Sequence, residues 1–284
     1  MKFTKMHGIG NDYIYFNCLD NDISDPNGLS IALSDRHFGV GGDGIVMIMR
    51  SKVADFRMRM FNADGSEGKM CGNATRCIGK YVYEKGLTDK TEITLETLGG
   101  IKQLELNVAD GKVVSVKVNM GKAVLEPEKI PVLLDGDKIV GRETVVGGNK
   151  HSITCVSMGN PHCVIFTENI DSLDLEKIGP KYENDPIFSE RVNTEFVEII
   201  DKNTLKMRVW ERGSGETWAC GTGASAVCVA AVLNGFASYD SDVTIKLRGG
   251  DLVINYKKDG TVYMTGPAAF VFEGETEKEF DIYA

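Results

Sequence analysis

Short segments in both halves of the chain alternate apolar and polar positions. A period of two is typical of a β-strand that buries one face and exposes the other. The pattern therefore predicts strands at 55–61, 92–97 and 113–118 in the first half, and at 204–210, 242–247 and 261–265 in the second.

Each half also contains one long helical pattern that starts shortly after a cysteine. The first helix is expected at about 74–85 and the second at about 224–234. Gly86 and Gly235 follow their last turns, and a glycine in that place commonly ends a helix. Weaker helices are expected near 29–36 and near 172–182.

Residues of the first half of the sequence recur in the second half in the same order. An offset of 149 positions, the spacing of Cys71 and Cys220, superimposes matching residues in the same order over most of the chain. We therefore expect an internal duplication that gives two similar α+β domains, with a ligand cleft between them. The matches include Asn11 with Asn160, Met58-Arg59 with Met207-Arg208, Phe61 with Trp210, Glu67 with Glu216, and Gly86 with Gly235.

Composition excludes several classes of protein. The chain has 284 residues, of which 42% are hydrophobic and 26% charged, and this balance fits a folded chain of two domains. A net charge of −9 without a run of Lys and Arg argues against a nucleic-acid partner. The longest apolar run, 226–233, is too short to cross a membrane, and the first residues lack an apolar signal core. We expect a cytoplasmic protein.

Seven cysteines without an export signal favour reduced thiols over a disulfide framework. None has Cys-x-x-Cys spacing, and the four histidines do not cluster with them, so no metal site is expected. Most of these cysteines are interpreted as small core residues, namely Cys18, Cys77, Cys155, Cys163 and Cys228.

Cys71 and Cys220 differ from the others because each follows a polar, glycine-rich loop and opens a helix. The positive end of the helix dipole favours the thiolate, so we expect both pKa values to be lowered toward neutrality. The free backbone N–H groups of each first turn can hold a carboxylate. These donors belong to Gly72, Asn73, Gly221 and Thr222.

Two equivalent thiols suit one type of reaction. Inversion of a carbon that carries a hydrogen needs a base on one face and an acid on the other. A thiolate and a thiol from duplicated domains would provide both groups, and exchange of their protonation states would allow the reverse reaction. Cys71 and Cys220 are therefore the candidate acid/base pair.

Short motifs recur in a fixed order along nearly the whole chain. They are GIGND at 8–12, NADGSE at 62–67, CGN at 71–73, GNPH at 159–162, ERG at 211–213, CGTG at 220–223 and GPA at 266–268. Through these motifs the chain resembles the diaminopimelate epimerase family. This resemblance implies an epimerase that interconverts LL- and meso-diaminopimelate without cofactor or metal, on the route to lysine and peptidoglycan precursors. It also implies a homodimer.

The family's fold and site residues are carried over as what the resemblance implies. Each domain would be a mostly antiparallel, barrel-like sheet around a central helix, with 1–118 joined by the final segment 263–284, and 119–262 as the other domain. Cys71 and Cys220 match the catalytic thiols, and His162 and Glu211 match residues that adjust thiol protonation. The substrate contacts would be Asn11, Asn62, Gly72, Asn73, Asn160, Asn193, Glu211, Arg212, Gly221 and Thr222.

Two positions depart from the family pattern. Gly44 stands where the family usually carries Gln, which puts one contact to the distal end of the substrate in doubt. Ala74 stands where Gly is favoured, and it adds a methyl group at the start of a helix.

Three other functions fit part of the pattern. A thiol oxidoreductase would use both cysteines but usually keeps them in Cys-x-x-Cys spacing. An amino-acid sensor would need the carboxylate-binding turns without the thiols. A two-cysteine proline or hydroxyproline racemase would need an apolar ring pocket, which the polar set of Asn62, Asn160, Asn193 and Arg212 does not favour.

Overall fold

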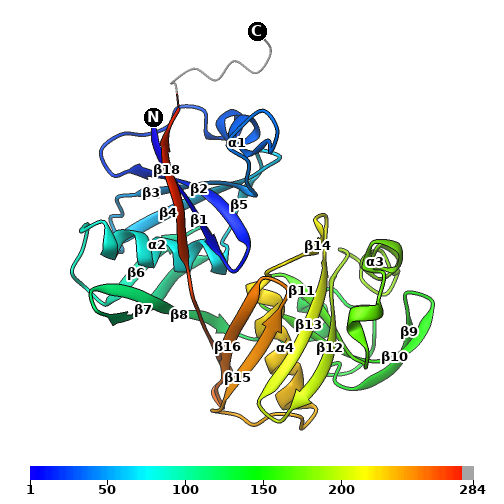
Figure 1. Cartoon of the computed structure of the whole chain (residues 1–284). Coiled ribbons are helices and arrows are strands. Elements are labelled where there is room, and N and C mark those ends of the chain that lie inside the picture. Colours follow the sequence, from blue (N-terminus) through cyan, green and yellow to red (C-terminus); the bar gives the residue numbers. More distant parts are fainter. Residues whose placement is uncertain (277–284) are drawn as a thin grey trace. The chain divides into compact units, whose positions relative to one another are not determined.

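The computed structural model describes residues 1–276, and these fold into two compact units (Figure 1). The N-terminal unit consists of Met1–Val118 and the segment that begins at Gly266. The C-terminal unit consists of Asn119–Thr265. The part of the expected segment 263–284 that follows Thr276 lies outside the described residues.

The N-terminal unit is a mixed sheet with two helices. Strand β1 pairs antiparallel with β2 and β18, β2 runs parallel to β3, and β4 pairs antiparallel with β3 and β5. Strand β6 runs parallel to β4, and β7 and β8 continue antiparallel. The elements are β1 (Lys2–Gly8), β2 (Asn11–Cys18), α1 (Pro26–Ser34), β3 (Gly44–Met49), β4 (Phe56–Asn62), β5 (Glu67–Gly68), α2 (Gly72–Glu84), β6 (Glu92–Thr97), β7 (Gly100–Ala109), β8 (Lys112–Lys122) and β18 (Ala269–Glu275).

The C-terminal unit repeats this arrangement. Strand β10 pairs antiparallel with β9 and β11, β11 runs parallel to β12, and β13 pairs antiparallel with β12 and β14 and parallel with β15. Its elements are the 3₁₀ turns Pro127–Lys129 and Ile170–Ser172, β9 (Arg142–Val146), β10 (Asn149–Ser157), β11 (Pro161–Phe166), α3 (Leu175–Glu183), β12 (Asn193–Asp201), β13 (Thr204–Glu211), β14 (Gly215–Thr217), α4 (Gly221–Leu233), β15 (Asp242–Leu247), β16 (Gly250–Tyr256) and β17 (Thr261–Gly266).

The strand registers of the two units match residue by residue. In β2–β3, Ile14 pairs with Ile45, and in β11–β12 the residues at the same offset, Cys163 and Thr194, pair with each other. Helices α1 and α3, and α2 and α4, begin and end at matching positions. The predicted α+β fold from an internal duplication is therefore confirmed.

Helices α2 and α4 are the central helices of their units. Helix α4 is buried around almost its whole circumference and packs against β10, β11, β12, β15 and β16 (Figure 1). Its small side chains allow this close approach. Both helices start two to three residues earlier than the hydrophobic pattern predicts, because their first turns are polar and rich in glycine.

Candidate functional site

Cys71 and Cys220 are the N-cap residues of α2 and α4. Both have extended backbone conformations, and the helix starts at the next residue, Gly72 or Gly221. The prediction that each cysteine opens a helix is confirmed. The first-turn N–H groups of both helices can donate to an anionic group.

In the N-terminal unit, Cys71 belongs to a hydrogen-bonded group with Asn11 and Asn73. The Cys71 thiol donates to Asn11 Oδ1 at 3.4 Å, and Asn73 Nδ2 donates to the same oxygen at 3.1 Å. Asn11 Nδ2 donates to Asp43 Oδ2 at 2.6 Å. Because a carboxylate only accepts, Asp43 fixes the Asn11 amide with its oxygen toward the thiol. Asp43 is a functional candidate that the sequence analysis missed.

A buried arginine also lies at the first turn of α2. Arg76 is fully buried and donates to Gly72 O at 3.3 Å, to Asn73 Oδ1 at 3.0 Å and to Pro267 O at 3.2 Å. Burial lowers the pKa of Arg76, whereas the sulfurs of Cys77 and Cys71 act in the opposite direction. A buried cation near Cys71 stabilises negative charge on that sulfur.

In the C-terminal unit, Cys220 is almost completely buried. Gly223 N–H donates to its sulfur at 3.3 Å, and Thr222 Oγ1 lies 3.5 Å from it. Burial nevertheless raises the pKa of Cys220 well above its ordinary value, and the carboxylates of Glu211 and Glu195 add to that rise. The expectation of a lowered pKa is therefore wrong for Cys220, because desolvation and two acidic neighbours outweigh the helix terminus.

Glu211 is the acidic neighbour that the sequence analysis anticipated. Burial raises its pKa, against hydrogen bonds from Thr217 and Cys220 that act in the opposite direction. Thr217 Oγ1 donates directly to Glu211 Oε1. The second acidic neighbour, Glu195, was not anticipated. Its Oε1 lies 2.7 Å from Nδ1 of His162, and both side chains are completely buried.

Asn160 connects this pair to the helix start. His162 Nε2 lies 3.0 Å from Asn160 Oδ1, and Asn160 Nδ2 donates to Thr222 Oγ1 at 3.3 Å. The structure thus brings together the predicted residues Asn160, His162, Glu211, Cys220 and Thr222.

The remaining predicted side chains have structural partners. Asn193 accepts from Arg212 N–H at 2.8 Å and donates to Pro161 O at 2.9 Å. The Arg212 guanidinium donates to Glu190 O, and Asn62 donates to Ser66 Oγ at 3.0 Å. Asn193 differs from the other two because both its amide oxygen and its amide nitrogen bind backbone groups. These contacts connect the segments that contain Arg212 and Pro161.

Other residues of the cysteine loops are structural. Glu67 binds Arg59 at 2.7 Å, and its counterpart Glu216 binds Arg208 at 2.8 Å, so both glutamates hold their loops to the preceding strand. Phe61 and Trp210 are buried in their cores. The five cysteines interpreted as core residues are all buried.

Gly44 cannot exchange freely with Gln. Its φ is +150°, and a Cβ built there would lie 1.9 Å from Phe61 O. A side chain at this position requires a shift of the β3–β4 pairing, in which Gly44 faces Asn62. A Gly44→Gln variant would therefore report on backbone strain as much as on substrate recognition.

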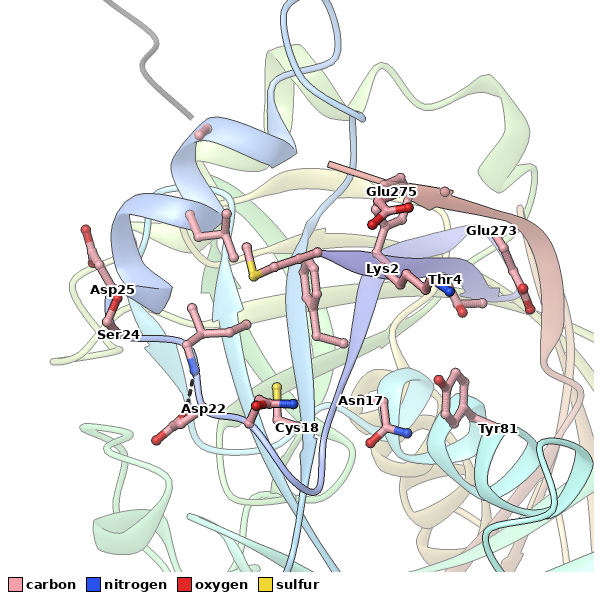
Figure 2. Close-up of a pocket in the computed structure, with 18 of the residues that line it drawn as sticks. Lys2, Thr4, Asn17, Cys18, Asp22, Ser24, Asp25, Tyr81, Glu273 and Glu275 are labelled. Carbon is pink, nitrogen blue, oxygen red and sulfur yellow. Dashed lines mark hydrogen bonds between the residues drawn. The ribbon is translucent and has the colours of Figure 1, made fainter. Parts of the chain in front are cut away.

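A cavity of about 1310 Å³ lies elsewhere in the N-terminal unit, between β1, β2, β18, α1 and α2 (Figure 2). Its labelled lining includes Lys2, Asn17, Cys18, Tyr81 and Glu273. None of these is a predicted site residue, and burial raises the pKa of Cys18 to about 12. Separately, no helix in residues 1–276 is long and apolar enough to span a membrane.

Comparisons with known proteins identify close relatives. A family model described as diaminopimelate epimerase matches residues 3–126 and 154–271. A diaminopimelate epimerase of Acetivibrio thermocellus is 57% identical over 278 residues, covering 98% of this chain and 99% of its own. One from Methanococcus maripaludis is 56% identical and covers 98% of this chain and 100% of its own.

Two solved structures share the fold at low sequence identity. A Bacillus anthracis phenazine biosynthesis protein of the PhzF family has a TM-score of 0.72 at 16% identity, with 98% of this chain and 99% of that chain covered. A hydroxyproline epimerase from Agrobacterium vitis has a TM-score of 0.71 at 13% identity, with coverages of 96% and 90%. At such identities the likeness supports the fold alone.

Proposed function

The chain belongs to the diaminopimelate epimerase family, and from that premise we propose that it interconverts LL- and meso-diaminopimelate by proton transfer at the α-carbon. The observation that carries the proposal is the equivalent placement of Cys71 and Cys220 as N-caps of the two central helices. Inversion needs one proton acceptor and one proton donor, and each unit supplies one thiol for these roles.

The surroundings of the thiols suit different starting roles. Burial and two carboxylates raise the pKa of Cys220, so this sulfur is held as a thiol that can return a proton. Cys71 lies near the buried Arg76 cation, which stabilises negative charge on this sulfur once the hydrogen that it donates to Asn11 Oδ1 has left. The reverse reaction requires the two protonation states to be exchanged.

The backbone N–H groups of each first turn would bind the α-carboxylate of the substrate. Gly72 and Asn73 provide them in α2, and Gly221 and Thr222 provide them in α4. Negative charge develops next to the carboxylate when the α-proton leaves, so donors already aimed at it lower the barrier. Asn11, Asn160 and the other polar side chains would bind the substrate's ammonium groups and distal carboxylate.

Family membership disfavours the other functions. Relatives at 56–57% identity over nearly the full chain are diaminopimelate epimerases, whereas the hydroxyproline epimerase shares only 13% of its sequence with this chain. A thiol oxidoreductase or a sensor would not require an N-cap cysteine at the same point of both duplicated units.

We also infer a homodimer in the cytoplasm, in line with the resemblance and with a role in lysine and peptidoglycan-precursor synthesis. Light scattering after size-exclusion chromatography measures the mass in solution. A mass of twice 31.1 kDa supports the dimer, and a mass of 31.1 kDa rejects it.

The function is tested with purified protein, LL-diaminopimelate and no added cofactor, by chiral chromatography of the products. Wild type should reach a mixture of isomers, and Cys71→Ala and Cys220→Ala should each abolish inversion. Cys18→Ala and Cys228→Ala remove a buried cysteine from each unit and should remain active. Full activity of either Cys71→Ala or Cys220→Ala would contradict the proposal.

A further inference from the structure

A buried carboxylate without an obvious structural purpose stands behind the Cys220 site. Glu195 lies on β12 and is completely buried, and within the described residues its Oε2 has no hydrogen-bond partner. Its Oε1 is 2.7 Å from His162 Nδ1. A half-satisfied buried carboxylate is unfavourable for folding, so its presence calls for a reason other than stability.

The hydrogen bonds beyond His162 fix the position of one proton. Asn160 directs its NH₂ group to Thr222 Oγ1, so its oxygen faces His162 Nε2 at 3.0 Å. An amide oxygen only accepts, and Nε2 must therefore carry a hydrogen and donate it. The contact between Nδ1 and Glu195 holds one further proton, on the ring or on the carboxyl group. In both cases the buried pair is neutral overall.

The same carboxylate also lies against the start of α4. A Cβ built at Gly223 would come within 2.8 Å of Glu195 Oε1 and within 3.1 Å of Cys220 Sγ. Glu195 therefore fits a space that exists only because residue 223 has no side chain. The other titratable groups that face Glu195 or His162 are Glu211, Cys220 and Cys163.

We propose that Glu195 is a positioning residue of the Cys220 site: it anchors Nδ1 of His162, keeps the Nε2–H directed at Asn160 Oδ1, and thereby holds Asn160 toward Thr222. The hydrogen bonds from Glu195 through His162 and Asn160 end at Thr222, two residues from the cysteine. The functional part of this inference rests on the proposed epimerase activity. The proton position on His162 does not.

The test combines a histidine spectrum with kinetics. Long-range ¹⁵N–¹H correlation on the full-length, ¹⁵N-histidine-labelled protein shows which ring nitrogen carries hydrogen, and His162→Gln assigns the signal among four histidines. Wild type should show a protected hydrogen on Nε2. In Glu195→Leu, Nδ1 loses its partner and the proton that it shares with Glu195, so its signal should change to that of a bare nitrogen. The ring is then no longer anchored, and we expect the Nε2 hydrogen to lose its protection and kcat/KM to fall roughly 10- to 100-fold.

Glu195→Gln is the conservative rescue, because its amide can still donate to Nδ1 and leave the hydrogen on Nε2. It should restore the protected hydrogen on Nε2 and most of the activity. Glu183→Gln is the matched control. Glu183 is also a buried carboxylate of this unit, but it binds Trp210 Nε1 and Arg191. Its variant should lose thermal stability without changing the His162 signal.

Three results would overturn the proposal: a bare Nε2 in wild type, an unchanged ring signal in Glu195→Leu, or wild-type kcat/KM in Glu195→Leu. The wild-type spectrum decides the first point even if Glu195→Leu does not fold. The spectrum needs no substrate. If the protein does not epimerise diaminopimelate while the ring signals behave as expected, the proposed function fails alone.

Discussion

Gly223→Ala tests the contact between the first turn of α4 and its buried surroundings. The added Cβ would lie 2.8 Å from Glu195 Oε1 and 3.1 Å from Cys220 Sγ. Glu195 is held by its 2.7 Å contact with His162 and cannot withdraw without lengthening it. A single methyl group is therefore expected to displace the sulfur or the carboxylate by a few tenths of an ångström.

Two opposing free-energy changes set the size of the stability change that Gly223→Ala causes. Overpacking of a well-filled core costs about 1–3 kcal/mol, whereas Ala in place of Gly within a helix contributes about 0.5–1 kcal/mol to stability. We expect a net loss of about 1–2 kcal/mol, which corresponds to a fall in Tm of roughly 2–8 °C. The displaced sulfur should lower kcat/KM by roughly 10-fold or more.

Gly79→Ala in α2 is the matched control. Its Cβ would also meet a side chain at 2.9 Å, but that neighbour is the flexible end of Leu106. Differential scanning calorimetry and chiral product analysis of both variants separate packing from chemistry. If Gly223→Ala is as active as Gly79→Ala, the account of a tightly fitted Cys220 site is incorrect.

Three further predictions concern stability. Burial raises the pKa of Glu211, so the native state retains a proton that the unfolded state releases above pH 4.5. Wild type then loses stability as pH rises above 4.5, and Glu211→Gln should become more stable relative to wild type over the same rise, measured by urea unfolding. A difference that does not depend on pH would contradict the raised pKa of the buried carboxyl group. Lys90 and Thr94 hold the pKa of Asp55 at about 2. With solvent screening taken into account, Asp55→Asn should lower the free energy of unfolding by about 1 kcal/mol at pH 7. This difference should disappear as pH falls from 3.8 to 2, because the wild-type carboxylate is then protonated. A difference that does not depend on pH would refute the ion pair. Arg76→Met removes the donors to Gly72 O and Asn73 Oδ1 and should cost about 2–4 kcal/mol in chemical denaturation, whereas an unchanged midpoint would show that the buried cation is dispensable.

The internal repeat made the fold predictable because residue types recur at the same offset, and not only the pattern of hydrophobicity. Offset matches such as Phe61 with Trp210 became matching register positions in the sheet. Strands β3 and β11 were not predicted from the sequence, and the reason is physical. Both are buried along nearly their whole length, so they read as continuous apolar runs without alternation.

Local reasoning was sufficient for the position of the two cysteines and insufficient for their chemistry. A helix start lowers a thiol pKa, but the burial of Cys220 and the carboxylate of Glu195 depend on strands far away in sequence. Glu195 itself occurs in the segment NTEFVE, where a glutamate that follows two polar residues indicates a solvent-facing position. Only its contact with His162, 33 residues earlier, shows that it points inward.

Isotope incorporation during the first turnovers in D₂O tests the two-thiol mechanism most directly. With LL-diaminopimelate as substrate, mass spectrometry of the separated isomers should find one deuterium at the α-carbon of the meso product, while the remaining substrate stays unlabelled. The reason is that separate sulfurs remove and return the proton. Equal labelling of both isomers from the earliest times would indicate a single base, and product without deuterium would exclude proton exchange with solvent through the second thiol.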